Sequence, residues 1–388
     1  MSKNIFNDTE IAYKLKSKIN LYNAKFLFQI ITKKFIVSIL TKITLFSLKF
    51  NIPIKWILRQ TIYNHFCGGT NLDECTKIIN NMRKMGVFSI LDFSVEALES
   101  EDDFDLALKK KIEIINLTKD NDSIPFSVFK PTSFGRYDLF KKVSSNIILN
   151  NHEKDEWMNV RKRFSKICRH AKESNMKILI DAEEYEVQKS IDDLALEMMK
   201  NFNTKSTVVY NTIQLYRFDR ISYIESLLTK FKKARFKFGF KLVRGAYLEK
   251  ERELAILNGY KSPICVSKKE TDKNFNDCIS LVFKNKTRID LFVASHNEES
   301  NLIVIKKIKK YSLNNDDSGI WFGQLYGMGD HISYNLAKNG FNVAKILPFG
   351  PVENLMPYLI RRAQENSSLE GQSNRELVLI NRELFRRN

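Results

Sequence analysis

The sequence predicts an α/β protein built on a (β/α)8 TIM-like barrel that follows a basic helical arm. Eight short runs rich in β-branched and aromatic residues recur after residue 80. Longer lysine- and leucine-rich stretches with helical periodicity separate these runs. Alternating strands and helices indicate a parallel sheet, and eight units over roughly 270 residues match the size of a closed barrel.

The basic arm is predicted over residues 1–75, and the barrel domain over residues 76–388. No Asp or Glu occurs from Ile11 to Leu72, although this segment contains ten Lys and Arg of a chain with net charge +18. Lysines interrupt its apolar clusters, so no window reaches the roughly 18 apolar residues of a membrane-spanning helix. Three interpretations stay open: a helical cap packed on the barrel, a membrane-surface contact, or a transit peptide or nucleic-acid patch.

The eight predicted strands cover residues 87–93, 124–130, 177–183, 207–216, 237–247, 289–297, 319–326 and 343–350. An open, doubly wound sheet is the structural alternative. Its usual signature is missing, because no strand leads into G-x-G-x-x-G and no G-x-x-x-x-G-K-[ST] occurs.

Cysteine and histidine usage argues against disulfides and metals. The five cysteines contain no C-x-x-C pair, which suits a reducing compartment and no cysteine-based zinc site. The five histidines lack H-x-x-x-H spacing. We therefore expect no metal centre.

Polar residues lie at or just beyond the ends of most predicted strands. They are Asp92, Lys130, Asp181 with Glu183, Gln214, Arg244 with Tyr247, His296 with Asn297, and Gln324. In a barrel, such residues converge at the C-terminal mouth, where active sites form. Any single one of them could instead be a satisfied structural group. Together they predict a site lined by cations and carboxylates but leave the reaction open.

Several segments resemble the proline dehydrogenase family and occur in that family's order. They are the segments of residues 66–70 (FCGGT), 90–96 (ILDFSVE), 180–184 (IDAEE), 241–249 (KLVRGAYLE), 294–297 (ASHN), 324–329 (QLYGMG) and 348–366 (PFGPVENLMPYLIRRAQEN). The resemblance covers roughly residues 60–385, and the combination of LVRGAY with YLIRRxxEN is its most specific part.

The resemblance implies oxidation of L-proline to 1-pyrroline-5-carboxylate with FAD as cofactor, the first step of proline catabolism toward glutamate. It also implies electron transfer to a membrane quinone and no nucleic-acid partner. We expect a cytoplasmic location that allows peripheral contact with the inner face of the membrane. No aldehyde dehydrogenase domain follows Arg387. We therefore expect a monofunctional enzyme with a separate pyrroline-5-carboxylate dehydrogenase downstream.

The resemblance also assigns roles to individual residues. It implies catalytic roles for Asp181, Tyr247 and Lys130, with Asp181 buried beside Lys130. Substrate binding falls to Lys130, Tyr358, Arg361, Arg362 and Glu365. FAD binding falls to Asp181, Gln214, Lys241, Val243, Arg244, Gly245, Ala246, Ser295, His296 and Asn297.

The spacing of the last motif is compatible with these roles. Tyr358, Arg361, Arg362 and Glu365 lie at i, i+3, i+4 and i+7 and share one face of a predicted helix. Adjacent guanidinium groups suit bidentate binding of a carboxylate, and Glu365 could orient them. Aromatic walls, here Tyr247 and Tyr358, are the means of fixing a small apolar ring.

Two departures from the family pattern are present. Ile346 stands where tyrosine is frequent, with Phe349 as the neighbouring aromatic residue, which leaves tolerance of hydroxyproline open. Lys241 stands where arginine is frequent, so the positive charge is kept but the planar guanidinium group, which can bind in a bidentate manner, is lost. Two other functions compete: a barrel enzyme acting on another small amino or hydroxy acid, and a basic membrane- or RNA-binding protein built on a degraded barrel.

Overall fold

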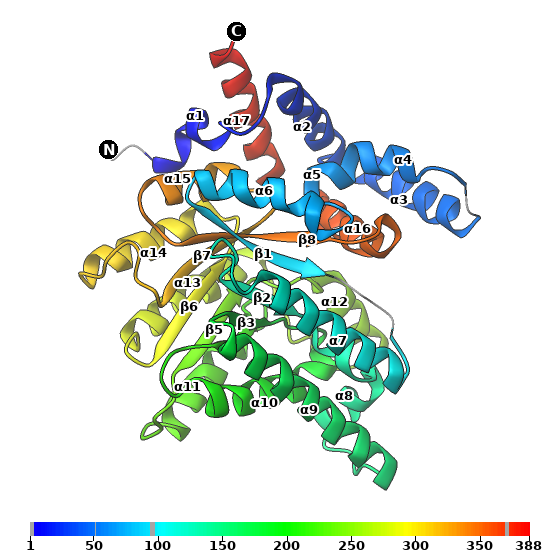
Figure 1. The fold of residues 1–388 in the computed structure, drawn as a ribbon, viewed down its shortest axis with the longest axis vertical. Coiled ribbons are helices and arrows are strands. Elements are labelled where there is room, and N and C mark those ends of the chain that lie inside the picture. Colours follow the sequence, from blue (N-terminus) through cyan, green and yellow to red (C-terminus); the bar gives the residue numbers. More distant parts are fainter. Residues whose placement is uncertain (1–3, 51, 94–97, 369–371) are drawn as a thin grey trace. The chain divides into compact units, whose positions relative to one another are not determined.

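A computed structural model describes residues 4–50, 52–93, 98–368 and 372–388, without the side chains of residues 48–49, 364–368 and 372–373. Eight parallel strands form a closed barrel in the order β1 to β8 (Figure 1). The strands are β1 (Val87–Phe93), β2 (Phe126–Phe129), β3 (Lys177–Ile180), β4 (Val209–Gln214), β5 (Phe238–Val243), β6 (Ile289–Ala294), β7 (Ile320–Leu325) and β8 (Val343–Phe349). The predicted (β/α)8 barrel is confirmed.

Each predicted run contains one strand, but several runs extend past the strand's C-terminal end. The run at 177–183 becomes a strand that stops at Ile180, and the run at 237–247 stops at Val243. The residues beyond these points include four of the polar residues that the sequence singled out, Asp181, Glu183, Arg244 and Tyr247. They lie in the loops that follow the strands. Side chains in a strand alternate between the two faces of the sheet, whereas those in a loop are free of this constraint.

The helices before the barrel are η1 (Ile5–Asn7), α1 (Thr9–Ala12), α2 (Lys18–Ile31), α3 (Lys34–Lys49), α4 (Lys55–Leu58), the π-helix η2 (Arg59–Tyr63), α5 (Asn64–Phe66) and α6 (Leu72–Lys84). Those between the strands are α7 (Glu101–Thr118), η3 (Pro131–Phe134), α8 (Tyr137–Ser144), α9 (Asn151–Glu173), α10 (Tyr185–Phe202), α11 (Arg220–Lys230), α12 (Leu248–Leu257), α13 (Lys268–Lys284), α14 (Glu298–Lys310) and α15 (Asp330–Lys338). The last two are α16 (Val352–Ser368) and α17 (Gln372–Arg386).

The chain divides into two compact units. Unit 1 comprises residues 1–94, 296–298 and 322–388, and unit 2 comprises residues 95–295 and 299–321. Unit 1 therefore contains the N-terminal helices together with β1, most of β7, β8 and α15 to α17. The predicted domain boundary at residue 75 stays a prediction.

Unit 2 is organised around strands β2 to β6, which pair in parallel as neighbours. An aromatic cluster joins these strands to the start of β7: the ring of Phe126 on β2 meets the ring of Phe292 on β6 edge-on at 5.2 Å and that of Trp321 on β7 at 4.9 Å. Helix α10 buries Val187, Ile191 and residues further along the same face, the pattern of an amphipathic helix.

Unit 1 pairs β1 with β8 along their full length and β7 with β8. Helix α2 buries Leu21, Ala24, Phe28 and Ile31, and all of these except Ile31 pack in one apolar cluster with residues of α17. Between β7 and α15, Gly327 has φ +80°, and a Cβ atom there would lie 2.2 Å from the carbonyl oxygen of His65. Only glycine fits this turn.

None of the described helices is both long and apolar enough to cross a membrane. All five cysteines are buried and free. Within the described residues, no group of three or more His, Cys, Asp and Glu side chains could hold a metal ion.

Candidate functional site

An ion pair connects two of the predicted site residues in unit 2. Lys241 Nζ on β5 lies 2.6 Å from Asp181 Oδ1, which follows β3. The side chain of Lys241 is only 5% exposed and that of Asp181 is 26% exposed. The sequence suggested Lys130 as the neighbour of Asp181, and the structure adds Lys241 as a partner of this carboxylate. A buried lysine needs such a counter-charge, because desolvating an unpaired ammonium group is costly.

Gln214 is the last residue of β4, and only the NH2 group of its side-chain amide makes a hydrogen bond. Its Nε2 donates to the carbonyl oxygen of Glu183 at 2.8 Å, which fixes the orientation of the amide. Its Oε1 is buried and has no hydrogen-bond partner. A buried acceptor without a donor is unfavourable, so this atom is suited to receive a hydrogen bond from a bound molecule.

Glu183 is a buried carboxyl that holds the turn after Lys130. Its Oε1 accepts from the Thr132 backbone N–H at 2.8 Å, and its Oε2 accepts from the Thr132 hydroxyl at 2.7 Å. Burial raises the pKa of Glu183 to about 7, against the opposing effect of the two hydrogen bonds. Lys130 itself is half-buried and directly precedes η3.

Arg244, just after β5, is held by three neighbours. Its Nε donates to Asp272 Oδ1 at 2.8 Å, Nη1 to Ser295 Oγ at 2.9 Å and Nη2 to Ser300 Oγ at 3.0 Å. The guanidinium carbon also lies 4.5 Å from the centre of the Phe275 ring. Burial lowers the pKa of Arg244, while Asp272 opposes the shift. These contacts fix the plane of the guanidinium group.

The loop after β5 brings the backbone close to an aromatic ring. Gly245 has φ +138°, and a Cβ atom there would lie 2.5 Å from the Tyr216 ring. Val243 is the last residue of β5, Ala246 is exposed, and Tyr247 precedes the first turn of α12. A loop of this kind lets a ligand approach the main chain.

In unit 1, helix α16 presents the predicted carboxylate-binding residues. Tyr358 is 7% exposed, and Arg361 and Arg362 are half-buried. The guanidinium carbon of Arg362 lies 5.4 Å from the centre of the Tyr358 ring. The predicted helix is confirmed, and its spacing places Tyr358, Arg361 and Arg362 on one face. Glu365 lies on the same helix, but its side chain is outside the described residues.

His296 carries a second buried polar atom without a partner. Its Nε2 accepts the backbone N–H of Leu325 at 3.3 Å, whereas Nδ1 has no hydrogen-bond partner. Burial lowers the pKa of His296 to about 3, so the ring is neutral near pH 7. Since Nε2 is an acceptor, the proton belongs on Nδ1, which is then an unused donor. The adjacent Asn297 is half-buried.

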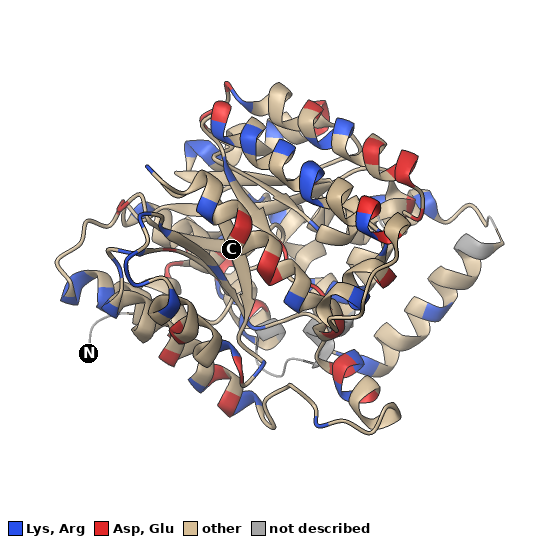
Figure 2. Cartoon of the chain, turned by 90° about the horizontal axis from the view of Figure 1, so that it is seen from below, with Lys and Arg blue, Asp and Glu red and all other residues tan. Residues whose placement is uncertain are grey.

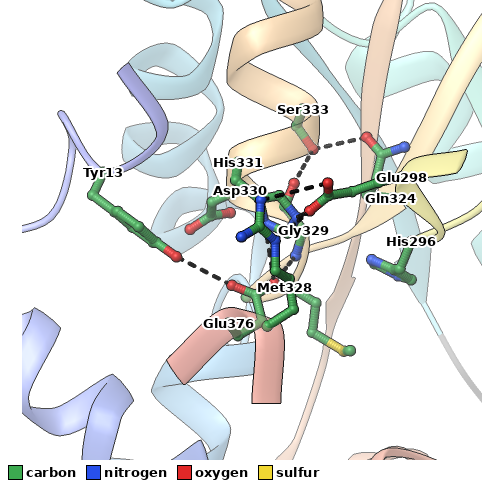
Figure 3. Close-up of polar contacts among 12 residues, drawn as sticks. Tyr13, His296, Glu298, Gln324, Met328, Gly329, Asp330, His331, Ser333 and Glu376 are labelled. Carbon is green, nitrogen blue, oxygen red and sulfur yellow. Dashed lines mark hydrogen bonds and ion pairs between the residues drawn. The ribbon is translucent and has the colours of Figure 1, made fainter. Parts of the chain in front are cut away.

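A buried ionic network surrounds the Gly-Met-Gly turn of unit 1 (Figure 3). Lys345 on β8 is fully buried, lies 2.8 Å from Asp330 Oδ1 and donates to the Met328 carbonyl oxygen at 2.6 Å. The backbone N–H of Gly329 donates to Glu376 at 2.6 Å. The predicted site residues do not include this network, although a lysine within the apolar run 343–349 was a detectable signal.

Glu298 connects the same network to residues near both ends of the chain. Its carboxylate lies 3.1 Å from His331 Nε2, accepts from Arg375 Nε at 2.7 Å and accepts from Asn4 Nδ2 at 2.9 Å. These contacts lower the pKa of Glu298 to about 2 even though burial opposes the shift.

The position of Ile346 bears on the substrate pocket that the family resemblance implies. Ile346 on β8 is 8% exposed, and the nearby Phe349 ring lies 5.3 Å from that of Phe93. A separate hollow of about 410 Å³ in unit 1 is lined by polar residues that include Lys16, Asn64 and His65. The predicted site residues are not among its lining residues.

Taken by unit, the structure connects Asp181 with Lys241 and Arg244 with Ser295 in unit 2. In unit 1 it brings Arg362 to the Tyr358 ring.

Comparisons with known proteins identify the family. A family model described as proline dehydrogenase matches residues 75–375. The carbapenem antibiotics biosynthesis protein CarD of Pectobacterium carotovorum subsp. carotovorum is 34% identical over 322 residues, which cover 83% of each chain. Mitochondrial proline dehydrogenase 2 of Arabidopsis thaliana is 31% identical over 374 residues, covering 85% of this chain and 79% of that protein. Hydroxyproline dehydrogenase of Xenopus laevis is 29% identical over 368 residues, covering 86% and 79%.

The solved structures agree in fold. Proline utilization A (PutA) from Bdellovibrio bacteriovorus superposes with a TM-score of 0.72 at 22% identity over 81% of this chain, which spans only 34% of the PutA chain. At this identity the likeness shows the barrel and no more. The family match and the curated relatives go further: the chain belongs to the proline dehydrogenase family and is an oxidoreductase that acts on proline.

Proposed function

We propose that this protein oxidises L-proline to 1-pyrroline-5-carboxylate with FAD as its cofactor. The observation that carries the proposal is the pair Arg361 and Arg362 on one face of α16, with the Tyr358 ring against Arg362. Two adjacent guanidinium groups suit a carboxylate, and the aromatic ring suits a small apolar ring beside it.

The chain's own polar groups fit FAD. Gln214 Oε1 is a buried acceptor without a donor, and His296 Nδ1 is a buried donor without an acceptor. A flavin with its adenosine diphosphate portion offers both kinds of partner. Lys241, Arg244 and Gly245 would supply charge and close backbone approach to the phosphates, with Val243, Ala246, Ser295 and Asn297 beside them.

The substrate groups follow the family resemblance. Arg361 and Arg362 would bind the carboxylate of proline, and Lys130 would contribute a further positive charge. Tyr358 and Tyr247 would contact the faces and edges of the ring. Asp181 would hold Lys241 in place through their ion pair, and Glu365 would orient the arginines.

FAD, when bound, supplies the hydride acceptor for the carbon next to the proline nitrogen. The protein's part is to orient this carbon by holding the carboxylate, and to accept proline with a neutral amine. No dedicated base is assigned, and solvent takes the amine proton.

The product's further path is also part of the proposal. The electrons would pass to a quinone-type acceptor, and a separate pyrroline-5-carboxylate dehydrogenase would take the product toward glutamate. We propose a cytoplasmic location with the quinone encountered at the inner face of the membrane.

The test is an anaerobic visible spectrum of the FAD-loaded protein before and after addition of L-proline, with hydroxyproline in parallel. Loss of the oxidised flavin band with proline supports the proposal, and the ratio of the two rates reports how Ile346 shapes the pocket. A matched pair of variants sharpens the result. Arg361→Met should raise the proline concentration needed for half-maximal reduction by about 100-fold, whereas Arg382→Met, an exposed arginine on α17, should not.

Other outcomes favour the competing functions. Bound flavin that neither compound reduces would point to another small amino or hydroxy acid. Protein that binds no flavin but binds RNA with a steep salt dependence would support the basic binding protein.

A further inference from the structure

The hollow of about 410 Å³ in unit 1 is large enough for a small molecule. Its lining residues come from the end of α1, from α2, η2, α5 and α6, and from the start of α15 with the loop before it. None of the residues proposed to bind proline or FAD lines it. A ligand of this hollow would therefore be independent of the proposed oxidation.

One positive charge beside the hollow lacks a paired counter-ion. Of the described residues that line it, only Lys16 and Asp330 are charged, since burial lowers the pKa of His65 to about 3 and leaves that ring neutral near pH 7. Asp330 Oδ2 lies 3.3 Å from Lys16 Nζ, and its Oδ1 lies 2.8 Å from Nζ of the fully buried Lys345. No other described carboxylate forms an ion pair with either lysine. Two ammonium groups therefore share one carboxylate.

Lys16 is held in place and stays protonated. Its side chain is 22% exposed. Arg387 donates to the carbonyl oxygen of Lys16 at 2.6 Å and to that of Tyr13 at 2.8 Å, which fixes the backbone that carries the lysine. Burial opposes the charged form, but Asp330 outweighs this effect and raises the pKa of Lys16. The hollow thus has a preorganised cation that solvent can reach.

Uncharged hydrogen-bonding groups make up much of the remaining lining. Five side-chain amides line the hollow, and none of them makes a hydrogen bond with a described residue: Asn20, Asn23, Gln60, Asn64 and Asn81. Each amide offers both a donor and an acceptor. The helices before α6 add no carboxylate, because no Asp or Glu occurs from Ile11 to Leu72. Figure 2 shows this for α3, the helix at the right edge that ends in grey, which is tan and blue without red.

We infer that this hollow binds a small organic anion, a phosphate monoester or a carboxylate that also carries hydroxyl groups. Its anionic group would lie against Lys16, since an ammonium group is a point charge that suits either kind of anion. Its hydroxyl groups would bind the amides, which can both donate and accept. A cation is a poorer occupant, because two lysines already share Asp330. An apolar molecule is poorer as well, because it would desolvate the amides without pairing them.

The experiment is isothermal titration calorimetry of the FAD-loaded full chain in Tris chloride. Three probes of similar size are titrated: glucose 6-phosphate, gluconate and the neutral glucose. The charge variant is Lys16→Met, and its matched control is Lys18→Met, an exposed lysine of α2 outside the hollow. The amide variant combines Asn20→Ala and Asn64→Ala, and its control combines Gln29→Ala and Asn80→Ala, two exposed residues that do not line the hollow.

We expect the wild type to bind at least one of the two anions with a Kd of about 1 mM or below, and glucose at least about tenfold more weakly. The better anion then identifies the anionic group. Lys16→Met should weaken its binding by about tenfold or more, because a charge-assisted hydrogen bond is lost. The amide variant should weaken it by about three- to tenfold. Its substituted side chains are exposed, so its thermal unfolding should match that of the wild type.

Four results would overturn the inference. Neither anion binds the wild type at concentrations up to about 10 mM. Glucose binds as tightly as the anions, which would remove the role of charge. Lys16→Met and the amide variant both bind like the wild type, which would place the anion elsewhere. Lys18→Met loses as much affinity as Lys16→Met, which would indicate attraction to the basic surface as a whole.

Discussion

Replacing Asp181 by Asn tests whether Lys241 depends on its counter-ion. The substitution keeps the size of the side chain and removes the charge 2.6 Å from Lys241 Nζ. Breaking a buried ion pair from one side costs about 3–5 kcal/mol, because the remaining charge is left unpaired. The carboxylate of Asp181 is 26% exposed, so water can replace it in part. We therefore expect a loss of about 2–3 kcal/mol in the free energy of unfolding.

The assay is urea unfolding of the flavin-free protein at neutral pH, in a double-mutant cycle with Lys241→Met. The double variant should be destabilised by less than the sum of the single variants, with a coupling energy of about 2 kcal/mol. The matched control is Asp193→Asn, whose pair with Lys189 is 3.3 Å long and more than half exposed on both sides. It should cost less than about 0.5 kcal/mol. A coupling energy near zero for Asp181 and Lys241, or a cost equal to that of the control, would refute the reasoning.

Three further predictions concern buried polar groups. The pKa of Glu183 is raised from 4.5 to about 7, so the free energy of unfolding should fall by about 3 kcal/mol as the pH rises from about 4.5 to 7. In Glu183→Gln, this dependence of stability on pH should be absent from urea midpoints measured across the same range. Lys345→Met leaves the carboxylate of Asp330 buried without its main counter-charge and should lower the free energy of unfolding by about 3–5 kcal/mol, whereas a loss below about 1 kcal/mol in urea unfolding would contradict the described pair. His296→Ala removes the unused Nδ1 donor and should weaken FAD binding by about tenfold in a flavin fluorescence titration; unchanged affinity would exclude a contact between His296 and the cofactor.

The barrel could be predicted because its signals are local. Each strand is a short apolar run, and the face of α16 follows from spacing alone. The strand ends were less predictable, since Asp181 and Arg244 continue an apolar run in the sequence but lie beyond the last paired residue. Hydropathy does not report where backbone pairing stops.

Most contacts of the candidate site could not be predicted from the sequence. Lys241 and Asp181 are 60 positions apart, and nothing in either segment specifies the other as a partner. Lys345 was visible as a charge within an apolar strand, but its pairing with Asp330 depends on how the Gly-Met-Gly turn directs α15. Long-range pairings of this kind arise from the arrangement of elements, which local pattern does not encode.

The division into two units has a consequence for synthesis on the ribosome. Unit 1 is assembled from residues 1–94, 296–298 and 322–388, so its earliest helices must wait for partners that are translated last. Tyr13 Oη donates to Glu376, and Arg387 donates to the carbonyl oxygens of Tyr13 and Lys16. At roughly 5–20 residues per second, the apolar surface of α2 would remain uncovered for some 20 s or more. We expect a holdase chaperone to bind the exposed apolar surface of unit 1 during synthesis. Most of unit 2 is contiguous in the sequence and can fold as it leaves the ribosome.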